Sequence, residues 1–392
     1  MKKILSIYHG IIPALLITLP VGSVYAFSLF STDMCNVLQC SLKEIQFAFS
    51  LSIFFLGMGA AFGGTLVEKN IKLSSFISAI LFACGLICTG ISLYTKQLWL
   101  TYVGYGCLCG IAQGLGYLTP VKTLLLWFPK HKGLATAISI ISFGLGSSLC
   151  TLFHSLFFAY FGILNIFFLL AIIYIIMMLL GCYLIKKPNI ENNLDNNYKI
   201  INLNYLELFK DKFFICSWLF MFLNISAGLS LIGSSTNIFK DLNISSDMII
   251  ILMMLAGVFN GGFRLVFAWI SDFLKIRLNI WYIINCISIV SIILALCNYS
   301  YIYITILIIN ACYGGGFSCI ASILSDHYGN NKLSRIHGLV LSAWGIAGLV
   351  GNNITTYIFG IFNSYFPLVI LLLCIYIINI LNSIIAKRYF KK

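Results

Sequence analysis

The sequence predicts an all-α integral membrane protein with 12 transmembrane helices in two six-helix lobes, and three observations lead to this fold class. The chain has 392 residues, of which 60% are hydrophobic and only 9% charged. Its mean hydropathy of +1.00 leaves too little polar surface for a water-soluble body of this size. Apolar runs of membrane-spanning length recur along the chain, and a glycine pattern appears twice.

Each predicted helix is an apolar run of about 20 residues or more, the length needed to cross about 30 Å of hydrocarbon. The runs lie at residues 8–31, 43–67, 73–95, 98–127, 133–159, 163–185, 213–238, 247–270, 280–297, 301–325, 336–360 and 364–386. The first run lacks a small-residue cleavage site, so we interpret it as a retained helix rather than a signal peptide.

The repeated pattern divides the chain into two lobes. Gly110 corresponds to Gly315 and Gly133 to Gly338, each 205 residues further along. Between the two copies, residues 186–211 are polar and Asn-rich, which predicts a cytoplasmic linker between an N-terminal lobe (1–185) and a C-terminal lobe (212–392). A membrane-helix plan that occurs twice favours a two-lobed transporter whose substrate lies between the lobes.

Many glycines lie three or four residues apart within the predicted helices, as Gly59 and Gly63 do in the second helix and Gly345 and Gly348 in the eleventh. Small residues at this spacing let helix backbones approach closely in lipid. Two roles would produce such a pattern: static packing of the helices, or helix interfaces that slide past one another.

The net charge of +13 is unevenly distributed. If the N-terminus is cytoplasmic and the helices alternate, 19 of the 24 lysines and arginines fall on the cytoplasmic side, and only Lys43, Lys96 and Lys240 lie opposite. The positive-inside rule then predicts that both termini are cytoplasmic. For the location we favour the plasma membrane over an organelle.

Several classes of protein are excluded by what the sequence lacks. No basic run is interleaved with stacking aromatics, so we expect no nucleic-acid partner. There is no Walker loop, nucleophile elbow or metal-ligand spacing, so we predict no enzyme activity, no catalytic residue, no cofactor and no metal site. Cys35 and Cys40 share the first outward loop, where a bridge and two free thiols both stay open.

Several segments resemble the major facilitator superfamily, and within it the oxalate/formate antiporter family, which is related to the monocarboxylate porters. The segments are residues 22–30, 47–50, 64–69, 114–117, 127–129, 222–229, 259–264 and 338–345. Two positions depart from the family pattern. Phe263 replaces a usual glycine, and the eleventh helix has only Asn352 and Asn353 where oxalate-handling members are expected to carry a basic residue.

The resemblance implies a major facilitator fold and a secondary transporter that works by alternating access. It also implies a cytoplasmic gating motif, carried here by Glu68 and Lys69 after the second helix and by Asp272 and Arg277 after the eighth.

Arg264 is the first candidate for substrate binding. It precedes Asp272 by eight residues, which places its backbone roughly 12 Å inside the membrane at 1.5 Å per residue. A guanidinium at that depth needs a partner, and no acidic residue occupies a predicted helix centre. An arginine fork matches a carboxylate, so the missing counter-ion is a candidate substrate. The alternative is an arginine that snorkels to the interface.

Asn260 lies one helical turn before Arg264 and belongs to the same candidate site. Tyr25, Tyr117 and Trp344 join it because they fall in helices that resemble the cavity-lining helices of the superfamily. Two further amides are candidates, with hydrogen bonding between helices as their alternative role: Gln113 and Asn352.

We therefore expect a transporter of small organic anions, either monocarboxylates or short dicarboxylates. Its partners are the anion and the lipid bilayer, and we expect a monomer. The alternatives are a facilitator of a neutral or cationic metabolite, with Arg264 purely structural, and a membrane receptor or scaffold on a transporter fold. Exchange, proton co-transport and uniport stay open.

Overall fold

The computed structural model describes residues 6–128, 132–188, 208–328 and 333–390, apart from a few side chains within them, and these residues form helices joined by short turns. The first half contains η1 (Ile7–Ile11), α2 (Ile12–Gly22), η2 (Ser23–Ala26), α3 (Ser28–Leu38), α4 (Leu42–Lys69), α5 (Ile71–Thr95), α6 (Leu98–Thr101), η3 (Tyr102–Cys109), α7 (Gly110–Trp127) and α8 (Lys132–Leu184). The second half contains α10 (Lys212–Ile232), α11 (Ser235–Asp241), α12 (Ser246–Phe273), η4 (Arg277–Asn279), α13 (Ile280–Cys297), η5 (Tyr299–Tyr301), α14 (Ile302–Tyr328), α15 (Leu333–Phe362) and α16 (Phe366–Tyr389).

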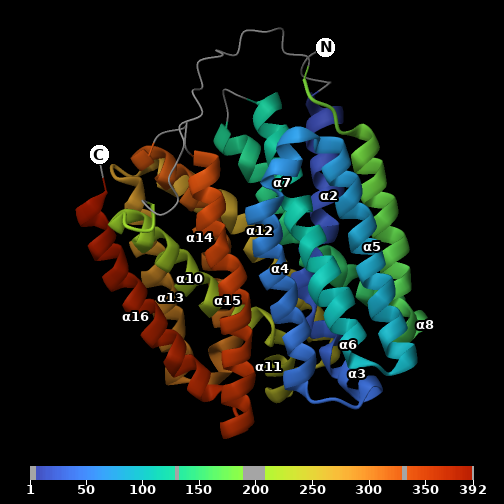
Figure 1. The fold of residues 1–392 in the computed structure, drawn as a ribbon. Coiled ribbons are helices and arrows are strands. Elements are labelled where there is room, and N and C mark those ends of the chain that lie inside the picture. Colours follow the sequence, from blue (N-terminus) through green and yellow to red (C-terminus); the bar gives the residue numbers. More distant parts are fainter. Residues whose placement is uncertain (1–5, 129–131, 189–207, 329–332, 391–392) are drawn as a thin grey trace.

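The two halves of the chain lie side by side (Figure 1). Within the N-terminal half α8 packs on α2 and α5, and α4 packs on α7. Within the C-terminal half α14 packs on α12 and α13, and α10 packs on α15 and α16. The halves meet where α4 contacts α15 and where α8 contacts α12. Most of the predicted linker, residues 189–207, falls outside the described residues.

Ten helices in the described part of the chain are long and apolar enough to cross a membrane, compared with the 12 that the sequence predicts. Two local features account for the difference. The predicted fifth and sixth helices form one run, Ile138–Leu184, which Gly162 interrupts with a φ of 60° that only glycine adopts easily. The predicted fourth helix, 98–127, is divided among α6, the π-helical η3 and α7.

Polar side chains fix several helix ends. Ser41 begins α4 with a capping box, because its hydroxyl accepts from the amide of Glu44 while the Glu44 carboxylate accepts from the Ser41 amide. Asn70 and Asp211 cap α5 and α10 in the same way through their side-chain oxygens. These caps set where each apolar stretch begins, and so align the helices across the bundle.

Glycine pairs bring the two halves into backbone contact. A Cβ atom built on Gly57 of α4 would lie 2.6 Å from the Cα of Gly345 in α15. One built on Gly144 of α8 would lie 2.5 Å from the Cα of Gly261 in α12. Because real Cβ atoms do not approach other atoms this closely, only glycine permits these two helix crossings.

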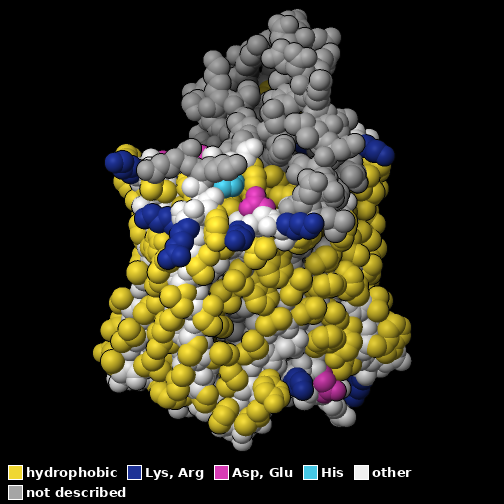
Figure 2. All heavy atoms as spheres, turned by 60° about the vertical axis from the view of Figure 1, so that its left-hand side comes forward, with side chains coloured by type: hydrophobic (Ala, Val, Ile, Leu, Met, Phe, Trp, Pro, Cys, Tyr) yellow, Lys and Arg dark blue, Asp and Glu magenta, His cyan; other side chains and the backbone are white. Residues whose placement is uncertain are grey.

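Lysines and arginines gather at one end of the bundle, above a broad hydrophobic belt (Figure 2). This end, here named the basic end, carries Lys69, Lys72, Lys186, Lys187, Lys275, Arg277, Lys387 and Arg388. Lys43, Lys96 and Lys240 lie at the opposite end. The distribution of charge therefore follows the prediction for alternating helices.

Side-chain hydrogen bonds join the halves toward the opposite end. The Ser28 hydroxyl of α3 bonds the Thr236 hydroxyl of α11 at 3.1 Å, and Gln46 donates to the carbonyl of Gly233 at 2.7 Å. Nearby, Cys35 and Cys40 are both free thiols, and burial raises the pKa of Cys35 to about 12. The opposite end is therefore closed by direct contacts between the halves.

Candidate functional site

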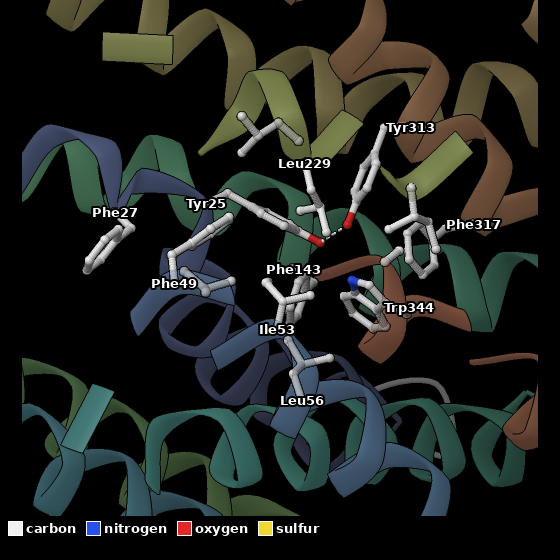
Figure 3. Close-up of a cluster of buried hydrophobic side chains, with 14 of the residues drawn as sticks. Tyr25, Phe27, Phe49, Ile53, Leu56, Phe143, Leu229, Tyr313, Phe317 and Trp344 are labelled. Atoms are coloured by element: carbon white, nitrogen blue, oxygen red, sulfur yellow. Dashed lines mark hydrogen bonds between the residues drawn. The ribbon is translucent and has the colours of Figure 1, made fainter. Parts of the chain in front are cut away.

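Six aromatic side chains from both halves meet in the middle of the bundle, and Figure 3 labels all of them except Tyr117. We name them the aromatic cluster: Tyr25, Tyr117, Phe143, Tyr313, Phe317 and Trp344. Each contacts the next in a closed circuit with centroid separations of 4.6–5.6 Å, the range in which aromatic pairs attract one another. The cluster thus spans the interface between the halves.

The sequence Tyr313-Gly314-Gly315-Gly316-Phe317 places two members of the cluster. A Cβ on Gly314 would collide with the carbonyl of Asn260 and lie 3.0 Å from the Cγ of Arg264. The three glycines therefore let α14 pack directly against α12 and α10. As a result Tyr313 and Phe317, one helical turn apart, reach the interface together.

Arg264 of α12 lies against this cluster and is only 1% exposed. Its Nη2 donates to the Oδ1 of Asn260 at 2.8 Å, and its Nε donates to the Asn260 carbonyl at 3.2 Å. The Cζ atom lies 5.4 Å from the centroid of the Phe317 ring. The arginine therefore neither points to lipid nor snorkels to an interface, and Asn260 fixes the orientation of its guanidinium.

The charge of Arg264 has no acidic partner in the part of the chain that the structure describes, where no carboxylate lies within salt-bridge distance of it. The charge lies close enough to interact with the hydroxyl groups of Tyr25, Tyr117 and Tyr313. Arg264 is also the sole charged residue among the buried side chains described. A buried cation in these surroundings is a strong attractor for an anion.

Two hydroxyls face each other beside the guanidinium. The Tyr25 and Tyr313 oxygens are 2.7 Å apart and form a hydrogen bond between the halves (Figure 3). The Trp344 indole nitrogen points toward this pair, but it has no hydrogen-bond partner of normal geometry. The site therefore combines one cation, two hydroxyls and one free N–H donor with apolar ring walls.

Five predicted site residues are brought together: Arg264, Asn260, Tyr25, Tyr117 and Trp344. Gln113 is buried, but its carbonyl oxygen accepts from Ser52 inside the N-terminal half, and this contact favours the packing role. The side chain of Asn352 lies outside the described residues.

The predicted gating residues of the C-terminal half form a network at the basic end. Arg277 Nη2 lies 2.9 Å from Asp272, and its Nη1 contacts both carboxylate oxygens of Asp326 at 3.1 Å. Lys69 is exposed at the end of α4, and the side chain of Glu68 falls outside the described residues. The network ties the end of α12 to the end of α14.

Three residues of these sites were missed by sequence reasoning: Phe143, Phe317 and Asp326. The glycine triplet flanked by aromatics was an available signal for Phe317. Phe143 directly precedes the interface glycine Gly144, a signal of the same kind, whereas Asp326 is 49 residues from Arg277 in the chain. Among the side chains described, no group of three or more His, Cys, Asp or Glu residues is placed to hold a metal ion.

Comparisons with known proteins agree with this architecture. The sequence model described as "Major Facilitator Superfamily" matches residues 12–352. An "Uncharacterized MFS-type transporter YhjX" of Escherichia coli strain K12 is 27% identical over 339 residues, which cover 84% of this chain and 82% of the relative. An "Oxalate:formate antiporter" of Oxalobacter formigenes is 23% identical over 356 residues, or 88% of this chain and 83% of the relative.

Proposed function

The chain belongs to the major facilitator superfamily and is a multi-pass membrane transporter, and from this premise we propose that it carries small organic anions. The observation that carries the proposal is the buried guanidinium of Arg264 at the interface of the halves. The oxalate:formate antiporter of Oxalobacter formigenes, although only 23% identical, lends support to an anionic substrate.

A buried charge is expensive to maintain without compensation. Removing an arginine from water costs several kcal/mol unless an opposite charge or a full set of hydrogen bonds replaces the water. Asn260 supplies acceptors to Nε and Nη2 of the guanidinium, and the Tyr25 hydroxyl also lies within interaction distance. A carboxylate from solution would complete the set, bound by the remaining N–H groups in a charge-assisted pair.

The composition of the aromatic cluster favours a monocarboxylate over a dicarboxylate. One cation balances one negative charge, and the remaining walls are rings and hydroxyls. A second carboxylate would face Phe143 or Phe317 without a counter-charge among the described residues, at a desolvation cost that these rings cannot offset. We therefore place lactate- or pyruvate-like anions before oxalate.

Transport would proceed by alternating access. Every member of the aromatic cluster is buried, so a substrate reaches Arg264 only after the halves move apart. The glycine crossings at Gly57 and Gly144 are surfaces on which the halves can rock, and the Arg277 network would steady the C-terminal half during that motion. The positive-inside rule would place the basic end in the cytoplasm.

Flux of radiolabelled formate, lactate, pyruvate and oxalate into proteoliposomes tests the proposal. Replacing Arg264 with Ala removes the charge, and we expect no saturable anion flux above empty liposomes. Replacing Arg264 with Lys keeps the charge but loses the two-pronged geometry, which should raise KM about 10- to 150-fold, the effect of losing a hydrogen bond to a charged group. Arg388→Ala, an exposed arginine at the end of α16, is the matched control.

Wild-type anion flux in both Arg264 variants would remove the arginine from the mechanism. Saturable uptake of a neutral or cationic metabolite that organic anions do not inhibit would then favour a facilitator in which Arg264 has a structural role.

A further inference from the structure

A second site lies far from the aromatic cluster, at the basic end of the N-terminal half. A cavity of about 370 Å³ opens there between the start of α5 and the segment that follows α8. Four lysines line it, namely Lys69 and Lys72 from one wall and Lys186 and Lys187 from the other. No aspartate or glutamate is among the described residues that line the cavity.

Hydrogen bonds hold both walls in place. The Trp127 indole donates to the carbonyl of Lys186 at 2.9 Å, and the amide of Lys186 donates to the carbonyl of His9 at 3.4 Å. The Cys182 thiol contacts the carbonyl of Lys72 at 3.4 Å. The four lysines therefore belong to two segments whose backbones are tied to each other and to the first helix.

The cavity has the electrostatics of an anion site. Four lysines line a volume of a few hundred cubic ångströms, and Asn70, which caps α5, also lines it. Such a combination suits a phosphate group, whose oxygens accept from ammonium groups.

The surface below the cavity distinguishes a lipid from a soluble phosphate. Leu73 and Phe76 on α5 are 45% and 46% exposed, and Leu180 and Tyr183 on the last turns of α8 are 48% and 77% exposed. Because α5 packs on α8, these side chains continue from the cavity onto the hydrophobic belt. We propose that the cavity binds the phosphate headgroup of an anionic phospholipid, whose acyl chains lie along this apolar surface.

Direct binding tests this site independently of the transported substrate. Native mass spectrometry of the full chain, titrated with dioleoylphosphatidylglycerol and with dioleoylphosphatidylcholine, measures the affinity for each lipid. We expect a saturable site for the anionic lipid that is at least tenfold tighter than for the zwitterionic one. Lys186→Gln/Lys187→Gln and Lys69→Gln/Lys72→Gln should each weaken the anionic lipid about 30-fold, since each surface lysine contributes about one factor of five.

The matched control is Lys210→Gln/Lys275→Gln, which removes two exposed charges from the same end without touching the cavity. An equal loss of affinity in this control, or no preference for the anionic lipid, would overturn the proposal, because general surface charge would then explain the binding. Glycerol 3-phosphate distinguishes the source of the phosphate. If it binds at the same lysines as tightly as the lipid does, the site belongs to a soluble phosphate and the lipid assignment is wrong.

Discussion

The crossing of α4 and α15 at Gly57 and Gly345 offers a sharp test of how the halves close. In Gly57→Ala, the added methyl group would lie 2.6 Å from the Cα of Gly345, against backbone atoms that no side-chain rotation can move. The variant cannot adopt the observed packing unless the two helices separate. Conformations in which the halves are further apart accommodate the methyl group without strain.

The expected magnitude follows from the cost of overpacking, which is about 1–3 kcal/mol for an inserted methyl group. At 1.4 kcal/mol per tenfold change, the ratio of closed to open molecules should fall about 5- to 150-fold. The helix itself should be little affected, since alanine favours helices more than glycine by roughly 1 kcal/mol.

Single-molecule fluorescence transfer between dyes on the two halves measures that ratio. Genetically encoded azides at Gln97 and Asn363 report the opposite end, and a second pair at Lys187 and Lys275 reports the basic end. All four positions are exposed, and each pair has one member in each half. We expect the short-distance population to shrink in Gly57→Ala at one end or both.

Gly64→Ala is the matched control, because Gly64 lies in the same helix and a Cβ there would meet no atom within 4 Å. It should leave both distance distributions as in the wild type. Identical distributions for Gly57→Ala and Gly64→Ala would refute the reasoning, since the glycine crossing would then not limit how closely the halves pack.

Three further substitutions test the site and its surroundings. Asn260→Asp gives Arg264 a carboxylate partner within the protein. Anion flux into proteoliposomes should then fall about 10- to 150-fold, the effect of displacing a charge-assisted partner. Flux at the wild-type rate would contradict the role of Arg264 in binding the anion. Tyr25→Phe keeps the ring but removes the hydrogen bond to Tyr313. The closed population in the fluorescence assay should fall about 2- to 12-fold. An unchanged population would show that this hydrogen bond does not hold the halves together. Asp326→Asn removes the exposed ion pair between this residue and Arg277. The free energy of unfolding, measured by thermal melting, should fall by no more than about 1 kcal/mol. A larger loss would contradict the weak contribution that the exposure of this ion pair implies.

Composition and periodicity were enough to predict the helical membrane fold. A segment that crosses the membrane must satisfy its own backbone hydrogen bonds, so it forms a helix, and contact with lipid makes its sequence a recognisable apolar run. The interruptions were harder to predict. Gly162 sits inside an apolar sequence that continues on both sides, and the π-helical η3 packs against α5 and α4 through Gly104 and Gly106.

Arg264 and Asn260 were predictable because a charge is rare in a membrane helix and an amide one turn away lies on the same helix face. The aromatic cluster was only partly predictable. Phenylalanine and tyrosine make up much of this chain, so identity alone cannot separate Phe143 from rings that face lipid, and its position depends on which helices meet across the interface. The lysine cavity likewise arises from segments more than 110 residues apart.

The bond between the Tyr25 and Tyr313 hydroxyls has a consequence for the unloaded carrier. One hydroxyl donates and the other accepts, so this bond replaces a hydrogen bond to water when the halves close around the two groups. A carboxylate that enters the site could accept hydrogen bonds from both tyrosines, and this would break the hydrogen bond between them that holds the halves together. Movement of the halves without a bound anion would then be slow, because breaking this hydrogen bond exposes two hydroxyls and forms no new contact with an anion.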